Sequence, residues 1–113
     1  MEIIDVSKEN DIAIVRPQVK RLDASVALAF KQEVQQVVES GEKALVLDLA
    51  DVQFMDSSGL GAMVSILKAL GAGGRLAVCN VTGAVLSLFK LTRMDRVFAI
   101  ASAPAEAIGM LKA

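Results

Sequence analysis

The chain has 113 residues, 54% of them apolar, and a formal net charge of −1. This length supports one hydrophobic core, and the apolar fraction excludes a disordered protein. The balanced charge argues against direct nucleic-acid binding, and no run of 18 apolar residues is present to span a membrane.

Histidine is absent, and Cys79 is the single cysteine. The chain therefore has no His-based catalytic triad and none of the common His metal sites. One cysteine forms no intrachain disulfide, which fits the cytosol, and its apolar surroundings predict a small core residue. Residues 1–10 lack the basic segment and apolar run of a signal peptide. We expect a cytoplasmic protein, and we assign it no metal and no cofactor.

The first part of the chain predicts two strands. Residues 1–6 and 12–16 are expected to form a hairpin around the polar turn 7–11, and Pro17 ends the second strand. Residues 18–22 are expected to be a connection.

A first helix is expected after this connection, capped by Asp23 or Ser25. Lys20 and Arg21 lie just before it, and a solvated turn explains both. If that turn lies beside Ser57, these two residues would instead contact a partner or a phosphate.

Strands and helices alternate in the rest of the chain. Apolar runs predict strands at residues 45–49, 75–81 and 97–100, and helix starts are expected at Asp56, Thr82 and Ser102. The order β-β-α-β-α-β-α-β-α implies right-handed crossovers and a mostly parallel or mixed sheet packed with about four helices. We expect one α/β domain over residues 1–113.

The segment D-S-S-G-L-G, residues 56–61, joins a buried strand to an amphipathic helix. Gly59 and Gly61 each cost roughly 1 kcal/mol against alanine inside a helix. Such a defect is typical of a place where backbone or a partner must come close. The predicted buried stripe of this helix is Leu60, Met63, Val64, Leu67 and Leu70.

The opposite face of the same helix is small and nearly uncharged, whereas a solvated face usually carries Lys, Glu or Arg. Two interpretations stay open: the face packs under another element of the domain, or it docks another protein. Its residues are Ser58, Gly61, Ala62, Ser65 and Ala69.

Asp56, Ser57 and Ser58 lie where a strand's carboxyl end meets a helix N-terminus, which is the ligand-binding edge of open α/β sheets. Capping is one role, because Asp and Ser are preferred N-caps. A nucleophilic serine is disfavoured, because histidine and the G-x-S-x-G elbow are both missing. The third role is phosphate acceptor. The helix dipole would stabilise that phosphate, so its effect would fall on whatever docks there.

Other matches in the chain are weaker. Ser65 and Lys68 fit S-x-x-K, but the companion motifs S-D-N and K-T-G are missing, which indicates a chance match. Asp48, Asp51 and Asp56 could hold Mg²⁺. Solvated loop positions and capping explain Asp48 and Asp51 as easily.

The chain resembles a known family at several points. F-M-D-S-S-G-L-G at residues 54–61 follows the strand L-V-L-D-L, R-L-D precedes the first helix, G-G-R-L precedes the fourth strand, and L-F-x-L-T lies in the third helix. This combination resembles the anti-sigma factor antagonists, which are STAS-domain proteins, over nearly the whole chain. The resemblance implies a STAS-like α/β fold.

The resemblance also implies a partner switch without catalysis. A serine kinase that is also an anti-sigma factor would phosphorylate the serine after the aspartate, which is Ser57 by position. The unphosphorylated protein would bind this kinase and release its sigma factor, phosphorylation would abolish binding, and a PP2C-type phosphatase would reset the switch. We expect no contact with nucleic acid or membrane. The predicted partner-binding residues are Asp56, Ser58, Gly59, Gly61, Ala62, Ser65, Asp23 and Arg21.

Lys20 and Arg21 depart from the G-E-L-D that many family members show, and some relatives control outputs other than sigma factors. A STAS-type module that senses a nucleotide or other small molecule is the alternative. A two-component receiver is a further alternative, but Val6-Ser7-Lys8 lacks the acidic pair expected after its first strand. Acid-stable phosphoserine and acid-labile acyl phosphate would distinguish a phosphorylated STAS module from a receiver.

Overall fold

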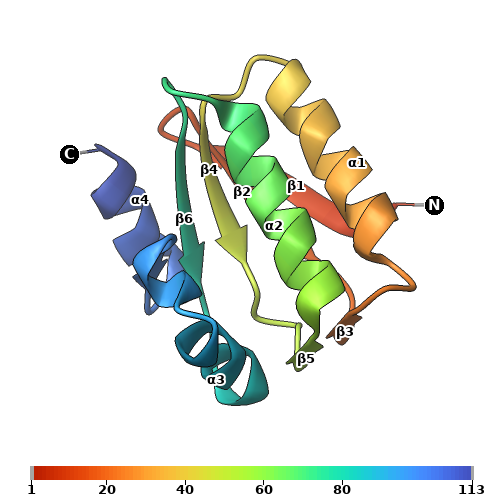
Figure 1. Ribbon diagram of the computed structural model, residues 1–113. Helices are drawn as coiled ribbons and strands as arrows, with labels where there is room; N and C mark the ends of the chain where they lie inside the picture. The colour runs from red at the N-terminus through yellow and green to blue at the C-terminus, as the bar shows by residue number, and fades with distance from the viewer. Residues whose placement is uncertain (1, 113) are drawn as a thin grey trace.

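The computed structural model describes residues 2–112, which form a five-stranded sheet with helices on both faces (Figure 1). The sheet order is β1-β2-β4-β6-β7, in which β1 is antiparallel to β2 and the other neighbours are parallel. The strands are β1 (Ile4–Glu9), β2 (Ile12–Pro17), β4 (Ala44–Asp48), β6 (Arg75–Cys79) and β7 (Ala99–Ala101). The predicted mixed sheet is confirmed.

Four α-helices lie within residues 2–112, as the sequence predicted. They are α1 (Ala27–Glu39), α2 (Ser57–Leu70), α3 (Gly83–Leu91) and α4 (Pro104–Lys112). In Figure 1, α1 and α2 lie side by side over one face of the sheet, and α4 lies behind the other face. None of the helices in this part of the chain has the length and apolarity needed to cross a bilayer.

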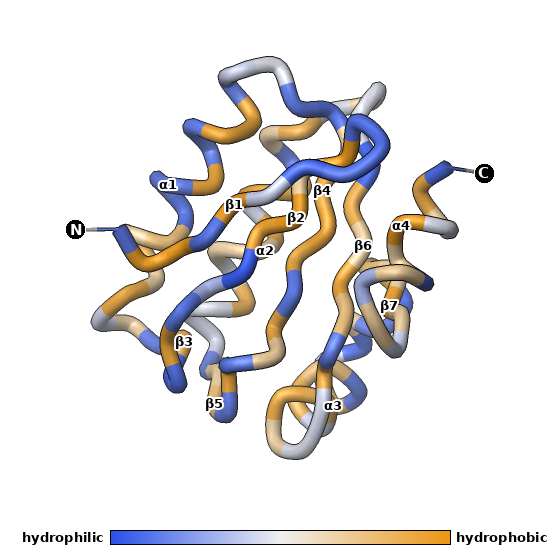
Figure 2. Tube along the Cα trace, turned by 180° about the vertical axis from the view of Figure 1, so that it is seen from behind, coloured by the Kyte–Doolittle hydropathy of each residue, from blue (hydrophilic) through white to orange (hydrophobic). Residues whose placement is uncertain are grey.

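The central strands are buried on both faces because each face is covered by helices. On β4, Leu45 and Leu47 belong to the core under α1 and α2, whereas Ala44 and Val46 belong to the smaller core under α4. Figure 2, seen from behind, shows β4 as a mostly apolar strand. This alternation follows from the period-2 direction of strand side chains.

The predicted element boundaries are wrong at the first hairpin and near the C-terminus. The first strand was expected over residues 1–6, of which Met1 lies outside the described residues, but β1 runs to Glu9. The turn contracts to Asn10 and Asp11, both with positive φ as a two-residue type I′ hairpin requires. The strand expected at 97–100 is β7, which begins only at Ala99 because a 3₁₀ turn at Met94–Arg96 precedes it.

Two predicted helix caps are also wrong. Helix α1 begins only after Val26, which makes no side-chain cap hydrogen bond, because Asp23 and Ser25 belong to a preceding turn. Thr82 precedes α3 but its hydroxyl caps no backbone N–H.

A second, two-stranded sheet was missed altogether. Strand β3 (Arg21–Leu22) pairs in parallel with β5 (Phe54–Met55). Residues 18–22 are therefore not merely a connection. Two-residue strands are too short to show periodicity in sequence, and only the tertiary fold brings them together.

Candidate functional site

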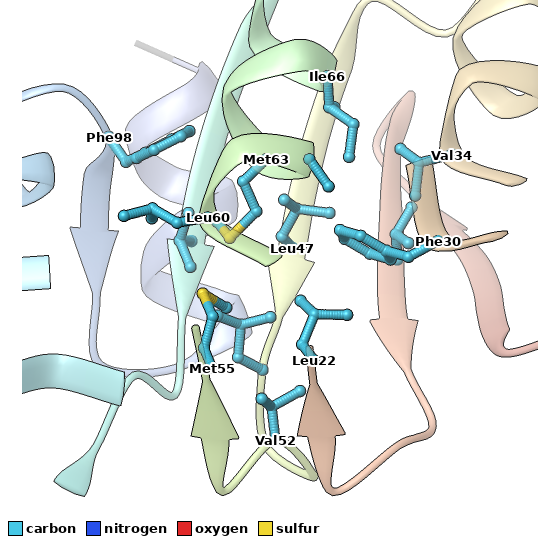
Figure 3. Packing of buried hydrophobic residues seen from close by; sticks show 14 of the residues in the cluster. Leu22, Phe30, Val34, Leu47, Val52, Met55, Leu60, Met63, Ile66 and Phe98 are labelled. Carbon is cyan, nitrogen blue, oxygen red and sulfur yellow. The ribbon is translucent and has the colours of Figure 1, made fainter. Parts of the chain in front are cut away.

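The β3–β5 pair places the start of α2 beside the approach to α1. Lys20 extends the ladder, because its carbonyl accepts from the backbone N–H groups of Gln53 at 2.7 Å and Phe54 at 3.1 Å. Leu22 and Met55 are the buried members of the pair and point into the core beneath α2 (Figure 3). The segments that continue from this pair, beginning at Asp23 and Asp56, therefore leave it side by side.

Gly59 lets the first turn of α2 rest directly on β3. A Cβ atom built on Gly59 would overlap the carbonyl oxygen of Leu22 and press on the side chain of Met55. The close approach expected at this glycine is therefore made by the chain's own backbone. Gly59 is buried, so it shapes the site from beneath.

Asp56 caps α2, as predicted. Its Oδ1 accepts from the backbone N–H groups of Ser58 at 2.9 Å and Gly59 at 3.2 Å. Ser57 is the first residue of the helix and is exposed, whereas Ser58 is half-buried. The cap orders the backbone around Ser57 and leaves its side chain on the surface.

Arg21 and Asp23 form an ordered charged group on the same side of the molecule. The Arg21 guanidinium lies 4.2 Å from the centre of the Phe54 ring, and its Nε donates to Asp23 at 3.3 Å. Asp23 also accepts from the Ser25 hydroxyl at 2.6 Å and from the Ser25 backbone N–H at 3.0 Å. These Ser25 bonds, followed by Arg21, lower the pKa of the Asp23 carboxyl. Asp23 therefore stays ionised to a lower pH than an ordinary aspartate.

The small face of α2 is partly covered and partly open. Packing under another element of the domain therefore holds for its covered part, and docking of another protein stays a hypothesis for its open part. Ala62 is buried beneath α1, as packing under another element of the domain requires. Gly61 stays exposed, and residues of both helices line an open surface groove of about 330 Å³. The groove is lined by Ala27, Leu28, Lys31, Ser58, Gly61, Ala62 and Ser65.

The burial of α2 is rotated relative to the predicted stripe. Leu60, Met63 and Leu70 are buried as expected, but Val64 and Leu67 are only half-buried. Ile66, which lies between them in the sequence, is fully buried and packs with Val34 and Phe30 in Figure 3. The reason is that α2 contacts α1 as well as the sheet, so its buried face is wider than one stripe.

The three carboxylates considered for Mg²⁺ do not converge. Asp48 is buried, and its Oδ1 accepts from the Ala50 N–H at 3.1 Å and the Asn80 amide at 2.8 Å, so a solvated position is wrong for it. Asp51 pairs with Arg16 at 2.8 Å. Within residues 2–112, no three His, Cys, Asp or Glu side chains come together as a metal site.

Cys79 lies in the core of β6, as predicted from its apolar surroundings. Burial, followed by the nearby charge of Asp48, raises the pKa of the Cys79 thiol to about 12. The thiol is therefore protonated and unreactive at neutral pH.

Sequence reasoning missed three residues that border the site. Phe54 supports Arg21, and Leu28 and Lys31 form the α1 wall of the groove. Phe54 lies inside the motif at residues 54–61, but no pattern in the sequence pairs it with Arg21 or assigns Leu28 and Lys31 to the site. The structure is needed to place these residues next to α2.

The chain is similar in sequence to known proteins over most of its length. The STAS domain family model matches residues 4–107. A Thermotoga maritima protein assigned by name to the anti-sigma factor antagonists is 33% identical over 101 residues, which cover 88% of each chain.

Solved structures share the fold. One is a crystal structure of a Thermotoga maritima protein that its name assigns to the anti-sigma factor antagonists. It superposes with a TM-score of 0.89 at 28% identity, covering 97% of this chain and 95% of that one. The phosphorylated form of the Bacillus cell fate determinant SpoIIAA superposes with a TM-score of 0.70 at 19% identity, covering 96% and 98% of the two chains, which shows the fold alone. With the family model matched over most of its length, the chain belongs to the STAS domain family.

Proposed function

We propose that this protein is a non-catalytic anti-sigma factor antagonist whose partner binding is abolished by phosphorylation of Ser57. The observation that carries the proposal is the position of Ser57, an exposed serine that opens a helix already capped by Asp56. The class of protein is supported by the name of the Thermotoga relative. Modification of this fold is supported by the name of the phosphorylated Bacillus protein.

A phosphate on Ser57 would act on the partner and leave the fold unchanged. It would add nearly two negative charges at a helix N-terminus, where the dipole and free backbone N–H groups favour an anion. Asp23 and Asp56 are already negative on the neighbouring segments. The summed charge would repel an acidic partner surface.

The expected cycle follows from this charge change. The unphosphorylated protein binds a serine kinase that is also an anti-sigma factor, and that kinase then releases its sigma factor. The kinase phosphorylates Ser57 and the complex separates. A PP2C-type phosphatase removes the phosphate and restores binding. The residues that meet the partner are the exposed Ser57, Gly61 and Arg21 with the half-buried Ser58, Ser65, Asp23 and Asp56, while Gly59 and Ala62 support them from below.

Phosphorylation by the host's anti-sigma factor kinase tests the proposal. We expect intact-mass analysis and site mapping, after incubation with ATP, to find one acid-stable phosphate on Ser57. Ser58→Ala serves as the matched control and should still be modified. A phosphate that persists undiminished in Ser57→Ala would refute the site.

The effect of charge on binding is a separate measurement. Ser57→Asp should weaken kinase binding by about tenfold or more, since like charges across an interface cost several kcal/mol. Its circular dichroism spectrum should match that of the wild type. Unchanged affinity would count against charge repulsion as the mechanism.

A further inference from the structure

The groove between α1 and α2 has an apolar floor and one charged side chain at its edge. Ala27 and Ala62 are buried at its base, and Gly61 leaves it open above. Leu28, on the α1 wall, exposes 61% of its surface to solvent. Lys31 lies on the same face of α1, one turn beyond Leu28.

We propose that this groove receives an apolar side chain of the protein partner, and that the partner places a carboxylate beside Lys31. The inference rests on the proposed function and names the chemistry of that partner: an acidic segment with one large apolar anchor. Within residues 2–112, Lys31 forms no ion pair, so its charge is available to a ligand. A leucine exposed to this extent at the rim of a groove is suited to covering an apolar anchor.

The groove is continuous with the phosphorylation site. Ser58 lines it, and Ser57 is the next residue towards the helix start. A phosphate on Ser57 would therefore lie at one end of the groove, where it would repel the same carboxylate that Lys31 attracts. This arrangement links the charge switch to a specific contact.

The glycine at the open side of the groove provides a direct test. A Cβ atom added to Gly61 meets nothing within 4 Å, so a larger side chain fits the free protein while it fills the groove. We expect Gly61→Leu to weaken binding to the purified kinase that modifies Ser57 by roughly tenfold or more, measured by titration calorimetry.

A matched control is available on α4. Gly109 is also exposed in a helix and also has free space at its Cβ position, on the other side of the sheet. Gly109→Leu should leave the affinity within about twofold of the wild type. Thermal melts establish that Gly61→Leu and Gly109→Leu are both folded. A third variant, Leu28→Ala, removes the exposed side chain at the groove rim without adding bulk. Wild-type affinity in both Gly61→Leu and Leu28→Ala would overturn the proposal that the groove receives a side chain of the partner.

The charge at the groove edge is tested in the same assay. Lys31→Glu should weaken binding by about tenfold and reduce its dependence on salt. Lys43→Glu makes the same change in net charge at an exposed position before β4 and should have little effect. Equal losses in the two variants, or none in Lys31→Glu, would overturn the carboxylate contact.

The two proposals fail in distinguishable ways. A wild-type protein that no anti-sigma factor kinase binds or phosphorylates would overturn the proposed function. A wild-type protein that is bound and phosphorylated normally, together with groove variants of wild-type affinity, would overturn only the assignment of the groove.

Discussion

Replacing Gly59 with alanine should damage the fold, although the same change two residues further on, at Gly61, should improve it. Alanine is favoured over glycine in a helix by roughly 1 kcal/mol at either site. At Gly59 the new Cβ would overlap the Leu22 carbonyl oxygen, which belongs to β3 and cannot rotate aside. At Gly61 the new Cβ meets nothing within 4 Å.

The size of the effect follows from these contacts. Overpacking costs typically about 1–3 kcal/mol, and backbone contact places Gly59→Ala near the upper end. After the helix gain of roughly 1 kcal/mol, a net loss of about 2 kcal/mol is left. Gly61→Ala should gain about 1 kcal/mol, so the two variants should differ by about 3 kcal/mol.

Urea unfolding followed by circular dichroism measures this difference directly. At this chain length it corresponds to a gap in Tm on the order of 10 °C. Equal stability of the two variants would refute the conclusion that β3 and the first turn of α2 are in backbone contact.

Three further predictions concern individual side chains. Asp56→Ala should lower the free energy of unfolding by about 1 kcal/mol in urea titrations, since it removes the α2 cap, whereas Asp56→Asn should keep most of it; equal losses would contradict capping. Hydrogen bonds from Ser25 are the chief cause of the lowered pKa of Asp23. They stabilise the fold at pH values above the ordinary carboxyl pKa, and this stabilisation is lost as the pH falls through the lower pKa that Asp23 has in the folded protein. Asp23→Asn should therefore destabilise the protein in urea titrations at pH 7 and leave it nearly unaffected at pH 2, and a pH-independent loss would argue against this. The Cys79 thiol should resist iodoacetamide at pH 8 in the folded protein and react after unfolding in urea, because its pKa is raised to about 12; rapid labelling of the native state would show that it is not buried.

The sequence predicted those parts of the molecule that depend on neighbouring residues. The cap at Asp56 and the alternation of strands and helices were visible because capping chemistry and hydrophobic periodicity are local signals. The close approach at Gly59 was predicted, but its cause was not, because Leu22 is far away in the sequence.

What the sequence did not reveal depends on contacts between distant segments. The strand pair β3–β5 has only two residues on each side, so it exists because the fold brings these segments together. Packing and docking stayed open for Ala62 because the position of α1 was unknown. For the same reason Leu28 and Lys31 could not be assigned to a groove before the two helices were placed.

The edges of the main sheet limit how another protein can attach to this one. Strand β1 forms one edge and carries the exposed charged residues Asp5, Lys8 and Glu9, whereas β7 at the other edge has only three residues. Charge and shortness are the two common means by which proteins protect open strands from pairing with another chain. Recognition by addition of a partner's strand is therefore disfavoured at both edges. Association is directed instead to the helices that cover the two faces, and concentrated protein does not join sheet to sheet.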